Sequence, residues 1–124
     1  MKETNFVKKV RARAKTRYYK NKKSECFICK ATKKLELHHI LPLAEIVKNY
    51  LKTNNVGGKT DEELVTEILE NCPEIFDENN VVTLCKQCHY WLHNLFGASY
   101  STKVAKNVQN YLIKKQEQRR KTHG

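Results

Sequence analysis

The sequence predicts a small α+β protein in which two short strands lie among helices. Apolar residues recur at helical spacing in several segments, whereas residues 35–40 and 81–84 have strand-like patterns. Four of the five cysteines form two Cys-x2-Cys pairs, which hold distant segments together when they share a metal ion. At 124 residues the chain has the size of one domain.

The amino-terminal third is expected to form a basic helix and then a strand. The helix covers residues 5–20. The strand covers residues 35–40, where Leu-Glu-Leu-His alternates, and it carries His38 and His39 at its end. Four residues at helical spacing form a thin apolar stripe on the helix: Phe6, Val10, Ala14 and Tyr18.

The middle of the chain, residues 43–72, is expected to be an acidic helical insert. Its first helix covers residues 43–51. A capping box that begins at Thr60 opens a second helix, which Pro73 stops. Cys72 continues the apolar face of that second helix, so we expect it to be buried rather than reactive.

The carboxy-terminal third is expected to hold a strand and two helices. The strand covers residues 81–84, and the next helix covers residues 86–96 and ends at Gly97. A long amphipathic helix with a basic outer face follows at residues 101–121. Three apolar residues of the helix at 86–96 are expected to pack in the core: Trp91, Leu95 and Phe96.

Charge is distributed unevenly along the chain. The net charge is +11 for residues 1–34, −7 for residues 35–80 and +7 for residues 81–124. Two basic ends suggest a polyanionic partner that the termini contact, although surface lysines that only aid solubility would give the same totals. The acidic middle would repel such a partner, so we expect it to face away from the polyanion or to bind a protein.

The four paired cysteines predict a structural zinc site. The amino terminus has no apolar stretch suited to a signal peptide, and no segment reaches membrane-spanning length. We therefore expect a cytoplasmic, reducing location, which favours metal ligation over disulfides. Two Cys-x2-Cys pairs complete a tetrahedral zinc site with these ligands: Cys26, Cys29, Cys85 and Cys88.

Four of the five histidines predict a second metal site next to a proton acceptor. His89 and His93 are four residues apart, so they share one face of a helix and can chelate an ion together. His38 and His39 are neighbours in a strand and point to opposite sides, so only one of them can face that ion. The other can point at a substrate, where a neutral imidazole can take a proton from water.

These motifs together resemble the ββα-metal finger of the HNH endonucleases. The resemblance covers residues 26–42 and 79–96 and implies a treble-clef-like finger with structural zinc, surrounded by helices in a single domain of residues 1–124. The residues that carry it are Leu37-His38-His39-Ile40-Leu41-Pro42, Asn80-Val81-Val82-Thr83-Leu84 and Cys85-x2-Cys88-His89-x3-His93.

The resemblance also implies roles for individual residues. His39 would be the general base, and Asn80 would brace the loop through backbone hydrogen bonds, with Asn79 as a rival for that role. The finger contains no arginine to clamp the scissile phosphate, so such a residue must come from elsewhere. Three histidines would bind a catalytic divalent ion such as Mg²⁺, Mn²⁺ or Zn²⁺: His38, His89 and His93.

The implied function is metal-dependent hydrolysis of DNA phosphodiester bonds that leaves a 5′ phosphate and a 3′ hydroxyl. One active site per chain implies nicking of one strand by a monomer or a weak dimer. Small enzymes of this build are similar to phage proteins linked to genome packaging. Packaging proteins are therefore candidate partners beside DNA, the host cytoplasm is the expected location, and no membrane partner is expected.

Three other interpretations of the same motifs remain open. A non-catalytic zinc-finger module that binds DNA would use the same cysteines, but it gives no reason for the clustered histidines. A protein-interaction or packaging factor would keep the finger without turnover. Cys85-x2-Cys88-His89 also matches the attachment signature of c-type haem, which requires export and leaves the first cysteine pair unexplained.

Overall fold

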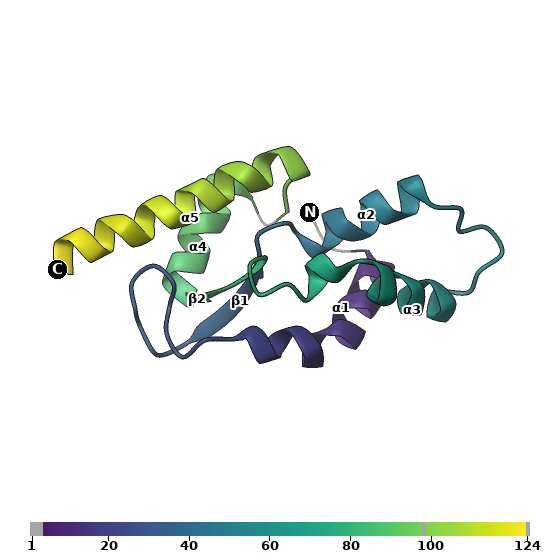
Figure 1. Cartoon of the computed structure of the whole chain (residues 1–124), viewed down its shortest axis with the longest axis horizontal. Helices are drawn as coiled ribbons and strands as arrows, with labels where there is room; N and C mark the ends of the chain where they lie inside the picture. The colour runs from purple at the N-terminus through teal and green to yellow at the C-terminus, as the bar shows by residue number, and fades with distance from the viewer. Residues whose placement is uncertain (1–3, 98, 124) are drawn as a thin grey trace.

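Two antiparallel strands and five α-helices make up most of the chain in this computed structural model (Figure 1). The structure describes residues 4–97 and 99–123, with side chains described through residue 118. Along these residues the elements follow in this order: α1 (Asn5–Tyr18), η1 (Tyr19–Asn21), β1 (Leu35–His39), α2 (Leu43–Thr53), α3 (Asp61–Asn71), η2 (Pro73–Ile75), β2 (Val81–Cys85), α4 (Lys86–Phe96) and α5 (Thr102–His123).

The β1–β2 pair has chemically different ends. Leu35 lies opposite Cys85 at one end, and His39 lies opposite Val81 at the other. Helix α4 begins directly after Cys85 and contacts both strands. The cysteines therefore gather at one end of the pair and the histidines at the other, and α4 connects the two groups.

The structure has two hydrophobic cores. Figure 1 shows the helices that form them in different parts of the molecule, with α1, α2 and α3 in one part and α4 and α5 in the other. The first core is formed by α1, α2, α3 and η2, with Val10, Leu43 and Ile68 nearly or fully buried. The second core is formed by β2, α4 and α5 together with the first cysteine pair, and it buries Leu84, Leu92 and Val108. The end of the strand pair that carries the histidines is thus supported by both hydrophobic cores.

The acidic insert folds as the local signals indicate. The side chain of Thr60 accepts a hydrogen bond from the amide of Glu63, and the Glu63 carboxylate accepts one from the Thr60 amide, which completes the capping box. Cys72 is 4% exposed, as predicted, and burial raises the pKa of its thiol to about 11. In α1 the buried stripe contains Val7, whereas Phe6 is only partly buried.

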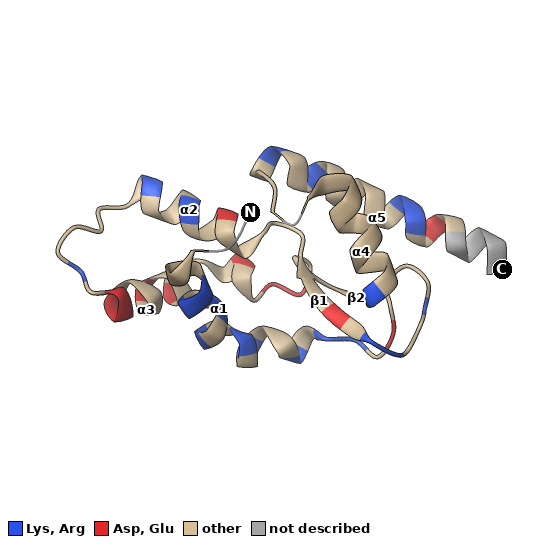
Figure 2. Cartoon of the chain, turned by 180° about the vertical axis from the view of Figure 1, so that it is seen from behind, with Lys and Arg blue, Asp and Glu red and all other residues tan. Residues whose placement is uncertain are grey.

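The charge of the insert has a partner within the chain. Lys9 on α1 forms an ion pair of 3.1 Å with Asp61, and Arg13 forms one of 3.4 Å with Glu62. Figure 2 shows the basic residues along α1 and the acidic residues gathered at the start of α3. The acidic residues of this turn therefore face a basic helix of the same protein, whereas the sequence suggested that the insert faces away from phosphates or binds another protein.

Two apolar residues on α4 correct the predicted core. Trp91 is 53% exposed and Leu95 is 60% exposed, so the expectation that they pack inside is wrong. Phe96 is partly buried and packs edge-on against Tyr111. Helix α4 has apolar residues on almost every side, and the face that is buried is the one around Leu92. Helical periodicity alone could not distinguish these faces.

Helix α5 covers the second core along much of its length. Val108 and Leu112 are buried, while Val104 and Tyr111 are partly buried, in agreement with the predicted inward face. The helix carries further lysines on its outer face (Figure 2). Among the described residues, no helix combines the length and the apolar character needed to cross a membrane.

Candidate active site

The first cysteine pair lies in a tight turn that precedes β1. The amide of Cys26 donates to the carbonyl of Ala31 over 2.8 Å, and the amide of Lys30 donates to the carbonyl of Cys26 over 3.1 Å. Lys30 adopts a left-handed conformation with φ 67°, which lets the chain reverse direction directly after Cys29. The turn therefore presents the two sulfurs on the same side.

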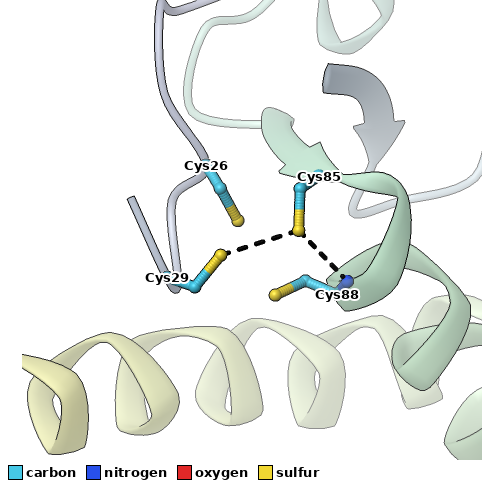
Figure 3. A group of neighbouring side chains, drawn as sticks. All are labelled: Cys26, Cys29, Cys85 and Cys88. Carbon is cyan, nitrogen blue, oxygen red and sulfur yellow. Dashed lines mark hydrogen bonds between the residues drawn. The ribbon is translucent and has the colours of Figure 1, made fainter. Parts of the chain in front are cut away.

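The second cysteine pair lies where β2 passes into α4. Cys85 is the N-cap residue of α4, and its sulfur accepts a hydrogen bond of 3.4 Å from the amide of Cys88. Helix geometry then turns the Cys88 side chain back toward the same point (Figure 3). The pairing of Leu35 with Cys85 in the sheet brings this second pair next to the first.

The four cysteine sulfurs lie close enough to hold one zinc ion. All four Sγ atoms are within 4.8 Å of one another, and those of Cys29 and Cys85 are 3.6 Å apart (Figure 3). With zinc–sulfur bonds of about 2.3 Å, a tetrahedral site places its sulfurs about 3.8 Å apart. The donor set and its spacing fit the predicted zinc site.

Acidity differs among the thiols of Cys26, Cys29 and Cys88. Burial is the largest influence on Cys26 and raises its pKa, but hydrogen bonds from the backbone of Cys29, Cys85 and Ile28 lower it to about 7 overall. Burial raises the pKa of Cys29 and of Cys88. Cys26 therefore ionises more readily than Cys29 and Cys88, and binding of zinc would displace protons from these two.

Three histidines converge at the other end of the strand pair. His38 comes from β1, while His89 and His93 lie one turn apart on α4. One ring nitrogen from each lies within 4.8 Å of the others, and Nδ1 of His38 is 3.2 Å from Nε2 of His89. Zinc–nitrogen bonds of about 2.0–2.1 Å place two ligands of a tetrahedral site about 3.3 Å apart. The three rings therefore fit one divalent ion.

Two further side chains lie within hydrogen-bond distance of the ring nitrogens that face away from the centre of the cluster. Nδ1 of His89 lies 2.8 Å from Oε1 of Glu36 and donates to it. Nε2 of His38 lies 2.7 Å from the hydroxyl of Tyr100, to which it would donate when Nδ1 binds a metal ion. These bonds leave Nδ1 of His38 and Nε2 of His89 to face the centre of the cluster, as metal ligands require. Neither Glu36 nor Tyr100 was singled out from the sequence.

Two histidines of the cluster are held in the neutral form. Burial is the largest influence on His38 and, together with the charges of its neighbours beginning with His89, it lowers the pKa of His38 to about 3. Burial also lowers the pKa of His93, and burial raises that of Tyr100. At neutral pH, His38 and His93 are therefore unprotonated, and the Tyr100 hydroxyl keeps its hydrogen.

His39 is separate from this cluster but lies beside it. Its Nε2–H donates to the carbonyl of Ile75 over 3.0 Å, and its ring meets the edge of Tyr18 at a centroid distance of 4.7 Å. The bond to Ile75 places the proton on Nε2, so Nδ1 carries the lone pair. The two neighbouring histidines thus point to different partners, as expected for adjacent strand residues.

Asn80 connects the end of β1 to the segment before β2. Its Oδ1 accepts from the amide of Leu41 over 2.8 Å, and its Nδ2 donates to the carbonyl of Glu74 over 2.9 Å. Its own carbonyl accepts from the amide of Ile40 over 2.8 Å. Asn79 is exposed, and its amide bonds only locally, to Asp77. Asn80 is therefore the asparagine that holds this loop.

An open pocket of about 360 Å³ joins these groups. The clustered histidines and His39 line it, together with the start of α2. Arg11 also lines the pocket, and it comes from α1, 27 positions before His38. The sequence contains one clue to this arginine, because it lies immediately beside Val10 of the apolar stripe. A cation thus lies in the pocket although the finger itself contains no arginine.

Comparisons with known proteins identify the family of the chain. No solved structure matches it. The model of the nicking endonuclease family named for phage T5 matches residues 2–122, which is nearly the whole chain. A nicking endonuclease cuts one strand of duplex DNA, so the match indicates an endodeoxyribonuclease. The chain therefore belongs to the phage T5 nicking endonuclease family.

Proposed function

We propose that the protein is a metal-dependent endonuclease of the HNH type that hydrolyses one DNA strand per active site. The observation that carries this proposal is the pocket in which the nitrogens of three histidines converge beside a fourth histidine that is bonded elsewhere. Membership of a nicking endonuclease family supports DNA as the substrate. For a phage enzyme, the host cytoplasm is the place of action.

The site divides the work of hydrolysis between two kinds of group. A divalent ion held by the three clustered histidines would stabilise negative charge on the phosphoryl oxygens and on the leaving 3′ oxygen. His39 serves as general base, because the bond from its Nε2–H to Ile75 puts the lone pair of the neutral ring on Nδ1, and that lone pair can take a proton from water. The water oxygen bonds to phosphorus as the bond to the 3′ oxygen breaks, and that oxygen takes a proton from solvent.

Arg11 is the group that contacts the scissile phosphate in this proposal. Its side chain lines the same pocket as His38 and His39, and its positive charge is felt at His38, whose pKa it helps to lower. A guanidinium can bind two phosphate oxygens at once, which a lysine cannot do. Arg11→Lys should therefore be impaired in nicking although its charge is kept.

The test compares variants of the two neighbouring histidines. Supercoiled plasmid is incubated with each protein and Mg²⁺ or Mn²⁺, and divalent-metal binding is measured on the same samples by calorimetry. His39→Ala should keep metal binding but lose about 10²–10⁴-fold in nicking, the usual contribution of a general base. His38→Ala should instead weaken metal binding. The control is His123→Ala, whose side chain lies outside the described residues and for which the sequence predicts no role.

Each opposite result has a definite meaning. If His39→Ala abolishes metal binding while His38→Ala keeps it, the two roles are exchanged. If none of the variants changes nicking, the observed activity comes from a contaminant, and a non-catalytic DNA-binding or protein-interaction module becomes the better interpretation. A link to genome packaging stays a prediction, because it rests on the sequence resemblance alone.

A further inference from the structure

Helix α1 has two basic flanks on either side of its buried stripe. The stripe contains Val7, Val10 and Ala14, which fixes the rotation of the helix against the first core. At 100° per residue, the basic residues on one flank are Lys9, Arg13 and Arg17, and those on the other are Lys8, Arg11 and Lys15. We name the flank with Lys9, Arg13 and Arg17 the α3 flank, and the flank with Lys8, Arg11 and Lys15 the pocket flank.

The α3 flank is occupied by contacts within the protein. Lys9 and Arg13 form ion pairs with the acidic first turn of α3. The guanidinium of Arg17 lies over the ring of Phe76, 3.8 Å from its centre. The positive charge of this flank is thus largely matched or covered by the acidic insert.

The pocket flank has a different environment. Lys8 and Lys15 are exposed, and neither forms an ion pair with a carboxylate in the part of the chain that the structure describes. Arg11 lies between them and lines the histidine pocket. From Lys8 to Lys15 the helix rises about 10 Å, over which one strand of B-DNA carries about three phosphates.

The surface continues past the end of α1. The Tyr19 ring is 41% exposed, and the ammonium groups of Lys15 and Lys22 lie 5.1 and 6.0 Å from its centre. Two cations beside an exposed ring extend the same basic surface away from the pocket. Figure 2 shows basic residues along the whole of α1 and into the segment that follows.

We infer that the pocket flank of α1 is the surface that holds the DNA backbone and leads it to the histidine pocket. This inference rests on the proposed function and adds the place where the substrate lies. Three cations at a spacing that suits successive phosphates, the middle one in the pocket, would fix the strand relative to the cluster. The acidic insert forms ion pairs with Lys9 and Arg13 on the opposite flank, so the pocket flank should attract DNA more strongly.

The test compares two double variants that remove the same charge from the same helix. Lys8→Ala/Lys15→Ala removes two cations from the pocket flank, and Lys9→Ala/Arg13→Ala removes two from the α3 flank. Alanine favours helix, so both proteins should keep α1, which circular dichroism can check. Binding to a short fluorescent duplex is measured by anisotropy over a range of salt concentrations, without added divalent metal, so that no cleavage occurs.

A plot of log affinity against log salt concentration has a negative slope, to which each phosphate contact contributes about −0.9. In the pocket-flank variant this slope should be shallower than in the wild type by about 1.8, the contribution of two contacts. In the α3-flank variant the slope should become shallower by less than about 0.9, the contribution of a single phosphate contact. The inference would be overturned if the slope changed equally in the two variants or changed more in the α3-flank variant. It would also be overturned if wild-type binding did not depend on salt. Failure of the proposed chemistry would instead appear as absent nicking with these slopes unchanged.

Discussion

The hydroxyl of Tyr100 lies 2.7 Å from Nε2 of His38, and both side chains are buried. The same hydroxyl lies 3.5 Å from the backbone carbonyl of His39, to which its hydrogen points. When Nδ1 of His38 binds a metal ion, Nε2–H would donate to Tyr100, whose own hydrogen then points at the carbonyl of His39. The hydroxyl thus supports the tautomer of His38 that leaves Nδ1 as a ligand, and it places a residue outside the predicted finger next to a proposed metal ligand.

Tyr100→Phe should weaken divalent-metal binding at the histidine cluster. Loss of the hydroxyl lets the His38 ring change tautomer or rotate, and loss of such an outer contact typically costs about 10–100-fold in metal affinity. Calorimetric titration with Mn²⁺ measures the effect. The matched control is Tyr111→Phe, because Tyr111 is another partly buried tyrosine that packs against Phe96 and lies away from the histidines. Equal affinities for the two variants would exclude this role for Tyr100.

Glu36→Gln should weaken metal binding through His89. The carboxylate accepts from Nδ1 of His89 over 2.8 Å and makes the other nitrogen a stronger ligand, whereas the amide of Gln keeps the shape but not the charge. We expect a smaller loss for Glu36→Gln than for Glu36→Ala in the same titration. Glu25→Gln is the control, because the Glu25 side chain is 48% exposed, close to the 47% of Glu36, and among the described residues its carboxylate pairs with Lys30 and not with a histidine. An unchanged affinity in both Glu36 variants would contradict the prediction.

Cys85→Ser should remove the structural zinc and leave the protein unfolded or insoluble. Cys85 joins β2, the four-cysteine cluster and the N-cap of α4, so its loss affects all three. Cys72→Ser is the control: it buries a hydroxyl at a cost of about 1–3 kcal/mol but leaves zinc in place. Metal analysis of purified protein and thermal unfolding measure both variants. A folded Cys85→Ser protein without zinc would show that the cluster is not structural.

Local signals in the sequence predicted the elements well where the chemistry is local. The bounds of α3 follow from the capping box at Thr60 and from Pro73, and those of α4 follow from Cys85 and Gly97. The Cys-x2-Cys spacing predicted that the cysteines share a site, and their sulfurs do lie together. The helix bounds depend on neighbours in the sequence and therefore little on tertiary packing. The shared cysteine site was predicted from donor chemistry, because two Cys-x2-Cys pairs complete one four-cysteine zinc site.

Contacts between distant segments could not be predicted in the same way. Arg11 reaches the pocket only because α1 packs on the first core with a particular rotation, and Tyr100 reaches His38 across 62 positions. The exposure of Trp91 depends on which face of α4 meets the sheet. The sequence predicted the composition of the site, whereas the residues that support it depend on packing.

The stability of the protein without added divalent metal should depend on the protonation of His38. Its pKa is about 3 in the folded protein, against a usual value of 6.5, because burial disfavours the charged ring. Below pH 6.5 the unfolded chain binds a proton at this residue and the folded chain does not. Acid therefore favours unfolding, and the contribution of His38 to stability is lost progressively as the pH falls from about 6.5 toward 3.

Urea unfolding at several pH values between neutrality and mild acid measures this effect. The free energy of unfolding of the wild type should fall more steeply than that of His38→Gln, by up to about 1.4 kcal/mol per pH unit for one proton. The glutamine keeps a polar group near Tyr100 but has no titratable ring. Protonation of the zinc-site thiolates affects both proteins alike, so it cancels in the difference. If the free energies of unfolding of the two proteins changed in parallel with pH, His38 would bind its proton as readily in the folded protein as in the unfolded chain. Folding would then not keep His38 in the neutral form that a metal ligand requires.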